Sequence, residues 1–233
     1  MHREAIFSPS TTPAAGWGAV PLLARVVSLD DPEQRNRVQV ALLSLSTDAA
    51  QAAPLWARVV APMAGNDRGL FCLPEVDDEV LLLFAQGDLR APLVIGGLWN
   101  GSSPSPADIE RGGENRTKRL RTKNGITITL DDQAGSETLT LETPGGQKLT
   151  LADGPGNVLL EDSNGNRIEL ASGGITVTAS ASVTVNASSV KVSAGMVTVD
   201  AGMSKFSGVV KCDTLITNAV VSSSYTPGAG NIW

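Results

Sequence analysis

The sequence predicts an all-β protein with two successive parts, a small closed barrel and a repeat of short strands. Three observations predict this. Apolar stretches of strand length recur through the first hundred residues, and apolar residues recur in alternating pairs after residue 119. No stretch is a convincing helix, since the one alanine-rich segment, 48–54, is short and ends at a proline.

The first part contains five expected strands within about 80 residues, joined by stretches rich in Gly, Pro and Asp. They are 20–29, 37–43, 56–61, 79–85 and 93–99. Five short strands with such connections suit a small closed barrel such as the OB-fold. The fourth is continuously apolar, which predicts burial on both of its faces. The Gly-, Ser- and Pro-rich stretch that follows, 101–108, has the composition of a linker.

The second part is a repeat of apolar residues at positions i and i+2. The intervening residue is polar or charged in every pair except one, where it is Leu159. This is the pattern of strands with one dry face. The pairs are Ile126/Ile128, Leu139/Leu141, Leu149/Leu151, Val158/Leu160, Ile168/Leu170, Ile175/Val177, Val183/Val185, Val190/Val192 and Val197/Val199.

The spacing of the pairs divides the repeat at Ile175. Before this residue the connections carry turn formers such as Pro144-Gly-Gly and Ser163-Asn-Gly-Asn, which allow hairpin reversals. Beyond it the pairs follow every seven or eight residues, and the connections lack most of the residues that tight turns need. We therefore expect the chain to turn corners and continue in one sense, as in a β-helix or β-prism.

A single strip with two apolar residues per strand cannot cover its own dry face. Three identical strips around one axis would bury all three faces and leave no long open edge. We therefore expect an intertwined homotrimer. The expected trimer core consists of Ile175, Val177, Val183, Val185, Val190, Val192, Val197 and Val199.

Composition argues against several classes of function. The formal charge is −6, and residues 1–100 carry 7 Lys or Arg against 11 Asp or Glu, which disfavours nucleic acid as a partner. The single histidine, His2, excludes multi-histidine metal sites. The two cysteines show no metal-binding spacing, and we expect both Cys72 and Cys212 to be buried free thiols. We expect no cofactor, no metal and no enzymatic activity.

Several motifs in a fixed order resemble a known family. They are Trp56-Ala-Arg-Val, Ala64-Gly, Pro74-Glu-Val-Asp-Asp-Glu-Val, Gly87-Asp and Gly97-Leu-Trp-Asn, followed by Asp162-Ser-Asn-Gly-Asn-Arg-Ile-Glu-Leu. Over about residues 20–210 the chain resembles the central spikes of contractile injection machines. These are the phage baseplate assembly protein V family and the C-terminal half of VgrG spikes of type VI secretion.

The resemblance implies an OB-fold collar above an intertwined trimeric β-helix needle that pierces the target envelope during sheath contraction. The implied divisions are an N-terminal extension (1–17), the collar (18–100), a linker (101–118), the spike (119–222) and a tip segment (223–233). The chain lacks the large hub domains of full VgrG proteins, so we expect a separate hub protein. We expect synthesis in the bacterial cytoplasm without a signal peptide, then assembly into a baseplate.

Two contact sites follow from this interpretation. A basic run between collar and needle is either a solvated linker or an electrostatic seat for the hub or for bound anions. Its candidate hub contacts are Arg116, Lys118, Arg119 and Arg121. The apolar end of the chain is either an anchor on the needle or a docking face for a PAAR-type tip protein. The candidate tip contacts are Tyr225, Ile232 and Trp233.

Two other classes of protein stay open. One is a trimeric β-helical fibre or adhesin stalk that binds a surface receptor, although a stalk has no need of a collar. The other is a β-helical carbohydrate-active enzyme, disfavoured because no carboxylates cluster on one expected face. The sequence also leaves open whether the machine is a phage tail, a tailocin, an extracellular injection system or a type VI apparatus.

Overall fold

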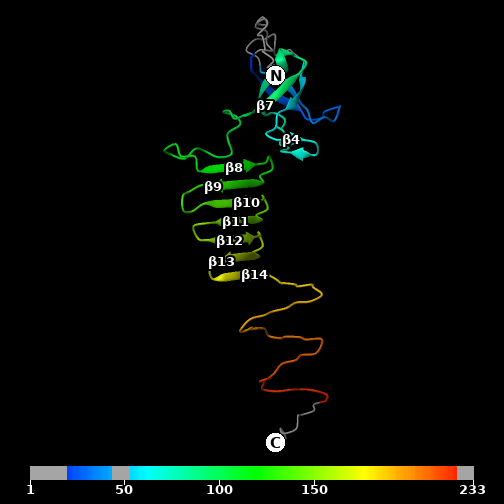
Figure 1. The fold of residues 1–233 in the computed structure, drawn as a ribbon, viewed down its shortest axis with the longest axis vertical. Coiled ribbons are helices and arrows are strands. Elements are labelled where there is room, and N and C mark those ends of the chain that lie inside the picture. Colours follow the sequence, from blue (N-terminus) through cyan, green and yellow to red (C-terminus); the bar gives the residue numbers. More distant parts are fainter. Residues whose placement is uncertain (1–19, 44–52, 225–233) are drawn as a thin grey trace, which may run out of the picture. The chain divides into compact units, whose positions relative to one another are not determined.

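The computed structural model describes residues 20–43 and 53–224. These residues form an all-β structure in which the only helical element is a single 3-10 turn, η2 (Ala85–Gly87). The expected fold class is confirmed. The strands divide into a closed barrel, a small hairpin and a seven-stranded sheet (Figure 1).

The barrel consists of the five strands that the sequence predicted. They are β1 (Leu22–Ser28), β2 (Val38–Leu42), β3 (Leu55–Val59), β6 (Glu79–Phe84) and β7 (Pro92–Leu98). The order around the barrel is β1-β2-β3-β7-β6, and β6 pairs with β1 to close it. All neighbouring strands are antiparallel except β3 and β7, which run parallel.

The barrel interior is filled by small and medium apolar side chains. Alternate residues of each strand point inward, as the two-residue period of a strand requires. The buried core consists of Ala24, Val26, Val38, Val40, Ala57, Val80, Leu82, Phe84 and Val94. The expectation that β6 is buried on both faces is wrong for the single chain, since its outward residues Leu81 and Leu83 are only half-buried.

A hairpin that the sequence did not predict follows β3. It consists of β4 (Ala64–Gly65) and β5 (Arg68–Gly69). Gly69 has φ +148, and a Cβ there would lie 2.5 Å from the backbone oxygen of Met63, so only glycine fits. Cys72 follows this hairpin and is exposed, contrary to expectation, because residues 70–78 belong to no barrel strand and do not alternate into the core.

The seven-stranded sheet is an antiparallel meander, and its strands follow one another in chain order (Figure 1). They are β8 (Thr117–Arg121), β9 (Thr127–Asp131), β10 (Thr138–Glu142), β11 (Lys148–Ala152), β12 (Asn157–Glu161), β13 (Arg167–Ala171) and β14 (Gly174–Thr178). The hairpin reversals expected before Ile175 are therefore confirmed.

Two turns of this sheet have the same local backbone conformation. Gly146 and Gly165 adopt φ +82 and φ +85, and each follows two turn residues. This is the geometry of a three-residue hairpin loop whose last residue is left-handed. In the second turn the side chain of Asn166 holds the Asp162 carboxylate, which lowers the pKa of Asp162 to about 2.

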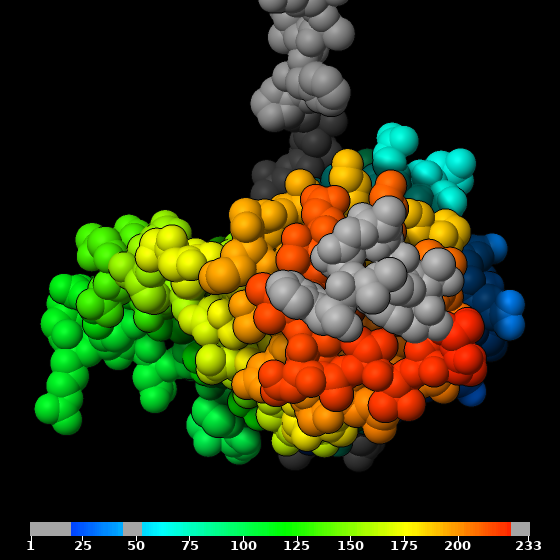
Figure 2. Space-filling model, turned by 90° about the horizontal axis from the view of Figure 1, so that it is seen from below, coloured from blue at the N-terminus to red at the C-terminus, as the bar shows by residue number. Residues whose placement is uncertain are grey.

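Beyond β14 the chain changes character. The chain divides at Val183, and residues 183–224 contain no assigned strand. Figure 1 shows this segment running back and forth in long open stretches, and Figure 2 shows it from below in orange and red. Its Cys212 is exposed, so the expectation of a buried thiol is wrong for the single chain.

Candidate functional site

One face of the seven-stranded sheet carries two continuous columns of apolar side chains. Residues directly opposite one another in a ladder share a face, as do residues i and i+2 of one strand. The first column is Leu120, Ile128, Leu141, Leu149, Leu160, Ile168 and Val177. The second is Leu130, Leu139, Leu151, Val158, Leu170 and Ile175, with Lys118 at its start.

This apolar face is uncovered in the single chain. Leu160 is 50% exposed, and exposure rises to 58% at Val177 and 71% at Ile175. An ordinary protein surface carries scattered apolar residues, whereas this face places them next to one another across seven strands. Continuous exposed apolar surface marks a site of association.

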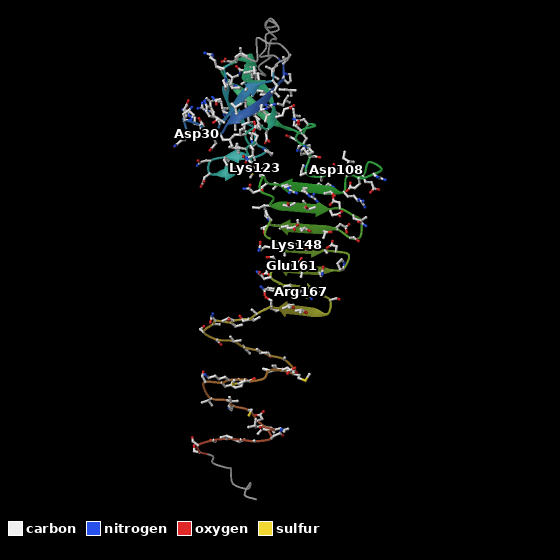
Figure 3. The ribbon with its side chains drawn as sticks, turned by 180° about the vertical axis from the view of Figure 1, so that it is seen from behind. Asp30, Asp108, Lys123, Lys148, Glu161 and Arg167 are labelled. Carbon is white, nitrogen blue, oxygen red and sulfur yellow. The ribbon has the colours of Figure 1, made fainter. Side chains whose placement is uncertain are left out.

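The opposite face is polar. Its middle column is Arg119, Thr129, Thr140, Thr150, Leu159, Glu169 and Thr176. Along one edge, charges of opposite sign alternate on neighbouring strands, and Lys148 pairs with Glu161 at 3.7 Å next to Arg167 (Figure 3). The apolar face therefore needs a partner, whereas the polar face suits contact with water.

The apolar pattern continues into the C-terminal segment. There the valines that the sequence assigned to the trimer core are all uncovered. Their exposures are 64% for Val183, 69% for Val185, 64% for Val190, 70% for Val192, 61% for Val197 and 70% for Val199. One chain does not bring these residues together.

Sequence reasoning assigned the core only from Ile175 onward and missed that the same stripe starts at Leu120. The signal was present as alternating pairs. Their union into two columns depends on the strand register, which the pairs alone do not specify.

The expected hub contacts lie in or just before β8, and most of them already have partners. Arg116 pairs with Glu114 at 3.2 Å, and Lys118 pairs with Asp132. Arg119, on β8, donates through Nη1 to the backbone carbonyl oxygen of Pro106 at 3.0 Å. The basic run is therefore partly neutralised within the chain, which reduces the charge available to a hub.

A buried ion pair that sequence reasoning missed shapes the barrel loop 31–37. Asp31 is 8% exposed, and its carboxylate accepts hydrogen bonds from Arg37 Nη2 at 2.7 Å and from the backbone N–H of Arg35 at 2.8 Å. The Arg37 side chain holds the pKa of Asp31 well below its usual range. The same guanidinium lies 5.7 Å from the centroid of the Trp56 ring, so one contact network ties the loop to β3.

Other classes of site have little support in the described part of the chain. Residues 20–43 and 53–224 contain no group of three His, Cys, Asp or Glu side chains placed to hold a metal ion. No helix among these residues is long and apolar enough to cross a membrane. The expected tip contacts, Tyr225, Ile232 and Trp233, lie outside the described residues.

Comparison with known proteins matches both parts of the chain. Residues 22–99 match the type VI secretion system/phage-baseplate injector OB domain, which corresponds to the barrel. Residues 138–203 match the phage baseplate V C-terminal trimerisation domain, which supports a homotrimer. This second match spans β10–β14 and the predicted core valines.

Similar proteins include type VI secretion system spike proteins and a toxin from two bacteria. The type VI secretion system spike protein VgrG3 of Vibrio cholerae is 29% identical over 89 residues, covering 37% of this chain and 9% of the relative. Spike protein VgrG1c of Pseudomonas aeruginosa is 24% identical over 102 residues, covering 41% and 14%. The actin cross-linking toxin VgrG1 of Vibrio cholerae is 26% identical over 132 residues, covering 52% and 12%.

The matched region spans about a tenth of the length of these curated relatives. The two domain matches together cover more than half of this chain, and they fall in the order barrel, then trimerisation domain. The barrel topology and the uncovered apolar face agree with that order. The chain therefore belongs to the baseplate V and VgrG-like family of spike proteins.

Proposed function

We propose that this protein is the homotrimeric spike at the centre of a contractile injection machine's baseplate. The needle is built from β8–β14 and the segment that follows, and it pierces the target envelope during contraction. The observation that carries the proposal is the apolar face of β8–β14, which lies open in the single chain, together with the exposed valines from Val183 to Val199.

A trimer explains this stripe physically. Each fully buried Val, Leu or Ile contributes roughly 1.5–3 kcal/mol, and the stripe places one such residue on nearly every second position of each strand. Three copies around one axis bury all three stripes and expose only the polar faces. The absence of strand pairing among the described residues beyond β14 fits a segment whose backbone partners belong to other chains.

A structural role is consistent with the mechanics of a spike. The energy for penetration comes from sheath contraction, so the spike needs stiffness and no turnover of a substrate. A braided β-rod supplies stiffness because every strand is bonded on both sides. We propose that a separate hub protein binds the collar, that a PAAR-type protein caps the tip, and that contact with the target membrane is transient.

Solution mass tests the trimer directly. Light scattering should give three times the chain mass of 24.1 kDa, and the assembly should resist heat and SDS. A monodisperse single chain that melts cooperatively at high concentration would overturn the proposal. An elongated trimer without a baseplate location would instead favour the receptor-binding stalk.

The location needs a separate experiment. A tag placed after residue 224 should label the membrane-proximal end of the baseplate in electron micrographs of assembled particles. Labelling along a side fibre would contradict the spike assignment while leaving the trimer intact.

A further inference from the structure

The outer surface of the barrel carries an acidic patch at the turn into β6. The patch consists of Glu75, Asp77, Asp78 and Glu79. The turn is well held, because the backbone N–H of Glu75 donates to Asp78 Oδ2 at 2.8 Å and that of Asp77 donates to Val26 O at 2.9 Å. The backbone of the turn is therefore held next to β1, where Arg25 lies opposite Glu79, and the Glu75 carboxylate pairs with Lys123 at 3.4 Å.

A second patch of opposite sign surrounds Trp56. A hollow of about 340 Å³ is lined there by Arg35, Arg58 and Arg90. Arg35 and Arg90 pair with nearby acids at 3.2 Å and 2.8 Å, but their side chains are 71% and 90% exposed. Pairs this exposed are worth about 0–1 kcal/mol, so both arginines can exchange partners. Arg58 is exposed and forms no ion pair within 20–43 and 53–224.

The strand order places these two patches on opposite sides of the barrel. Arg58 lies on β3, whose neighbours are β2 and β7. The acidic turn lies at the seam where β6 pairs with β1, which is the position farthest from β3 in the closed order. One chain cannot therefore bring its own acidic patch to its own Arg58 on β3.

Each patch also has apolar surface beside it. Val27 and Val76 flank the acidic turn and are 38% and 41% exposed. Near the arginines, Met63, Leu70 and Phe71 line a larger groove of about 590 Å³, and they are 59%, 50% and 71% exposed. Mixed apolar and charged composition is typical of a protein interface.

We infer that in the trimer the acidic patch of each barrel docks on the arginine patch of the next copy. This inference rests on the proposed homotrimer and extends it to the collar. A three-fold ring requires a heterologous contact, in which two different patches of one surface meet. Patches of opposite charge on opposite sides of one barrel meet that requirement. Arrangements that bring two patches of the same charge together are disfavoured.

Site-specific cross-linking of the full chain tests this contact. In a Cys72→Ser, Cys212→Ser background, Arg58→Cys and Asp77→Cys are combined and treated with a short bismaleimide. After complete denaturation we expect covalent trimer as the main product. Each single variant should give none, because a heterologous contact does not bring two copies of one residue together.

A matched control moves the arginine substitution to the acidic side. Arg25 is exposed on β1, so Arg25→Cys with Asp77→Cys places both thiols on one side of the barrel and should give no covalent trimer. For the Arg58 pair the reaction should also be several-fold slower at about 1 M salt, where the Debye length is roughly 3 Å.

The outcomes separate the two proposals. A trimeric mass without covalent trimer overturns the collar contact, keeps the homotrimer, and leaves the arginines to another partner such as the hub. Covalent trimer from a single variant also overturns the collar contact. A monomeric mass refutes the proposed function itself.

Discussion

The substitution Val192→Thr tests whether this side chain lies in the trimer core. Threonine has nearly the shape of valine, but it replaces a methyl group with a hydroxyl. Val192 is 70% exposed in the single chain, so the substitution costs little before association. If the trimer buries this position, the hydroxyl loses its water and finds only apolar neighbours from the other two copies.

The expected magnitude follows from burial and symmetry. Burying a hydroxyl without a partner costs about 1–3 kcal/mol on protein-derived scales. Three-fold symmetry repeats this cost in each copy, which gives about 3–9 kcal/mol per trimer. Each 1.4 kcal/mol is tenfold in an equilibrium constant, so the association constant should fall by about two to six orders of magnitude.

The assay follows dissociation of the trimer by light scattering and by SDS gels across a series of temperatures. Thr198→Val is the matched control, since it makes the reverse exchange at a position of opposite phase and should leave dissociation nearly unchanged. An unchanged dissociation midpoint in Val192→Thr, or an equal loss in the control, would refute the assignment of this valine to a dry core.

Three further substitutions test other parts of the structure. Gly69→Ala should destabilise the β4–β5 hairpin by roughly 1–3 kcal/mol, because a left-handed φ and a carbonyl oxygen 2.5 Å away reject a Cβ. Amide hydrogen exchange of the hairpin measures this loss. Gly96→Ala, with no atom within 4 Å, is the control, and a loss of equal size in that variant would contradict this reasoning. The lowered pKa of Asp31 adds stability that is present above about pH 4 and lost as pH falls through the lower folded value. Asp31→Asn should remove that acid-dependent loss and melt lower at neutral pH, measured by tryptophan fluorescence. Leu160→Thr, on the apolar face, should weaken the trimer more than Leu159→Thr on the polar face, as measured by solution mass; equal effects would argue against a one-sided interface.

The seven-stranded sheet and the segment that follows it differ in how their backbone N–H and C=O groups are hydrogen-bonded. The sheet from β8 to β14 pairs its strands within one chain, since a glycine-containing turn reverses the chain after most strands. The segment after β14 has lost those turns, and it has no assigned strand through residue 224. The first region is a scaffold that one chain can form, while the second makes no strand pairing among the described residues.

Much of the secondary structure could be predicted because it depends on local patterns of apolar and turn-forming residues. The period-2 pairs from Ile126 to Val177 located strands β9–β14, although the later pairs coincide with no assigned strand and β8 was missed. Turns such as Pro144-Gly-Gly separated the reversing part of the repeat from the part after Ile175. The β4–β5 hairpin was missed because its strands are only two residues long, too short for any period to show.

Burial was predicted less well than strand position. Cys72 lies between apolar neighbours, and only the fold shows that its segment leaves the barrel wall. For β6, an apolar run does not say whether its second face is covered by the same chain or by another one.

The all-β class, the barrel followed by a repeat, and the need of a one-sided apolar strip for partners could be predicted from the sequence, because these depend on local periodicity and turn chemistry. How the strip is assembled became visible in the folded chain. Strand register joined separate pairs into two columns, one beginning at Leu120 and the other at Leu130. Closure of the barrel placed Arg58 and the acidic turn into β6 on opposite sides. Both depend on contacts between residues far apart along the chain, which no local pattern specifies.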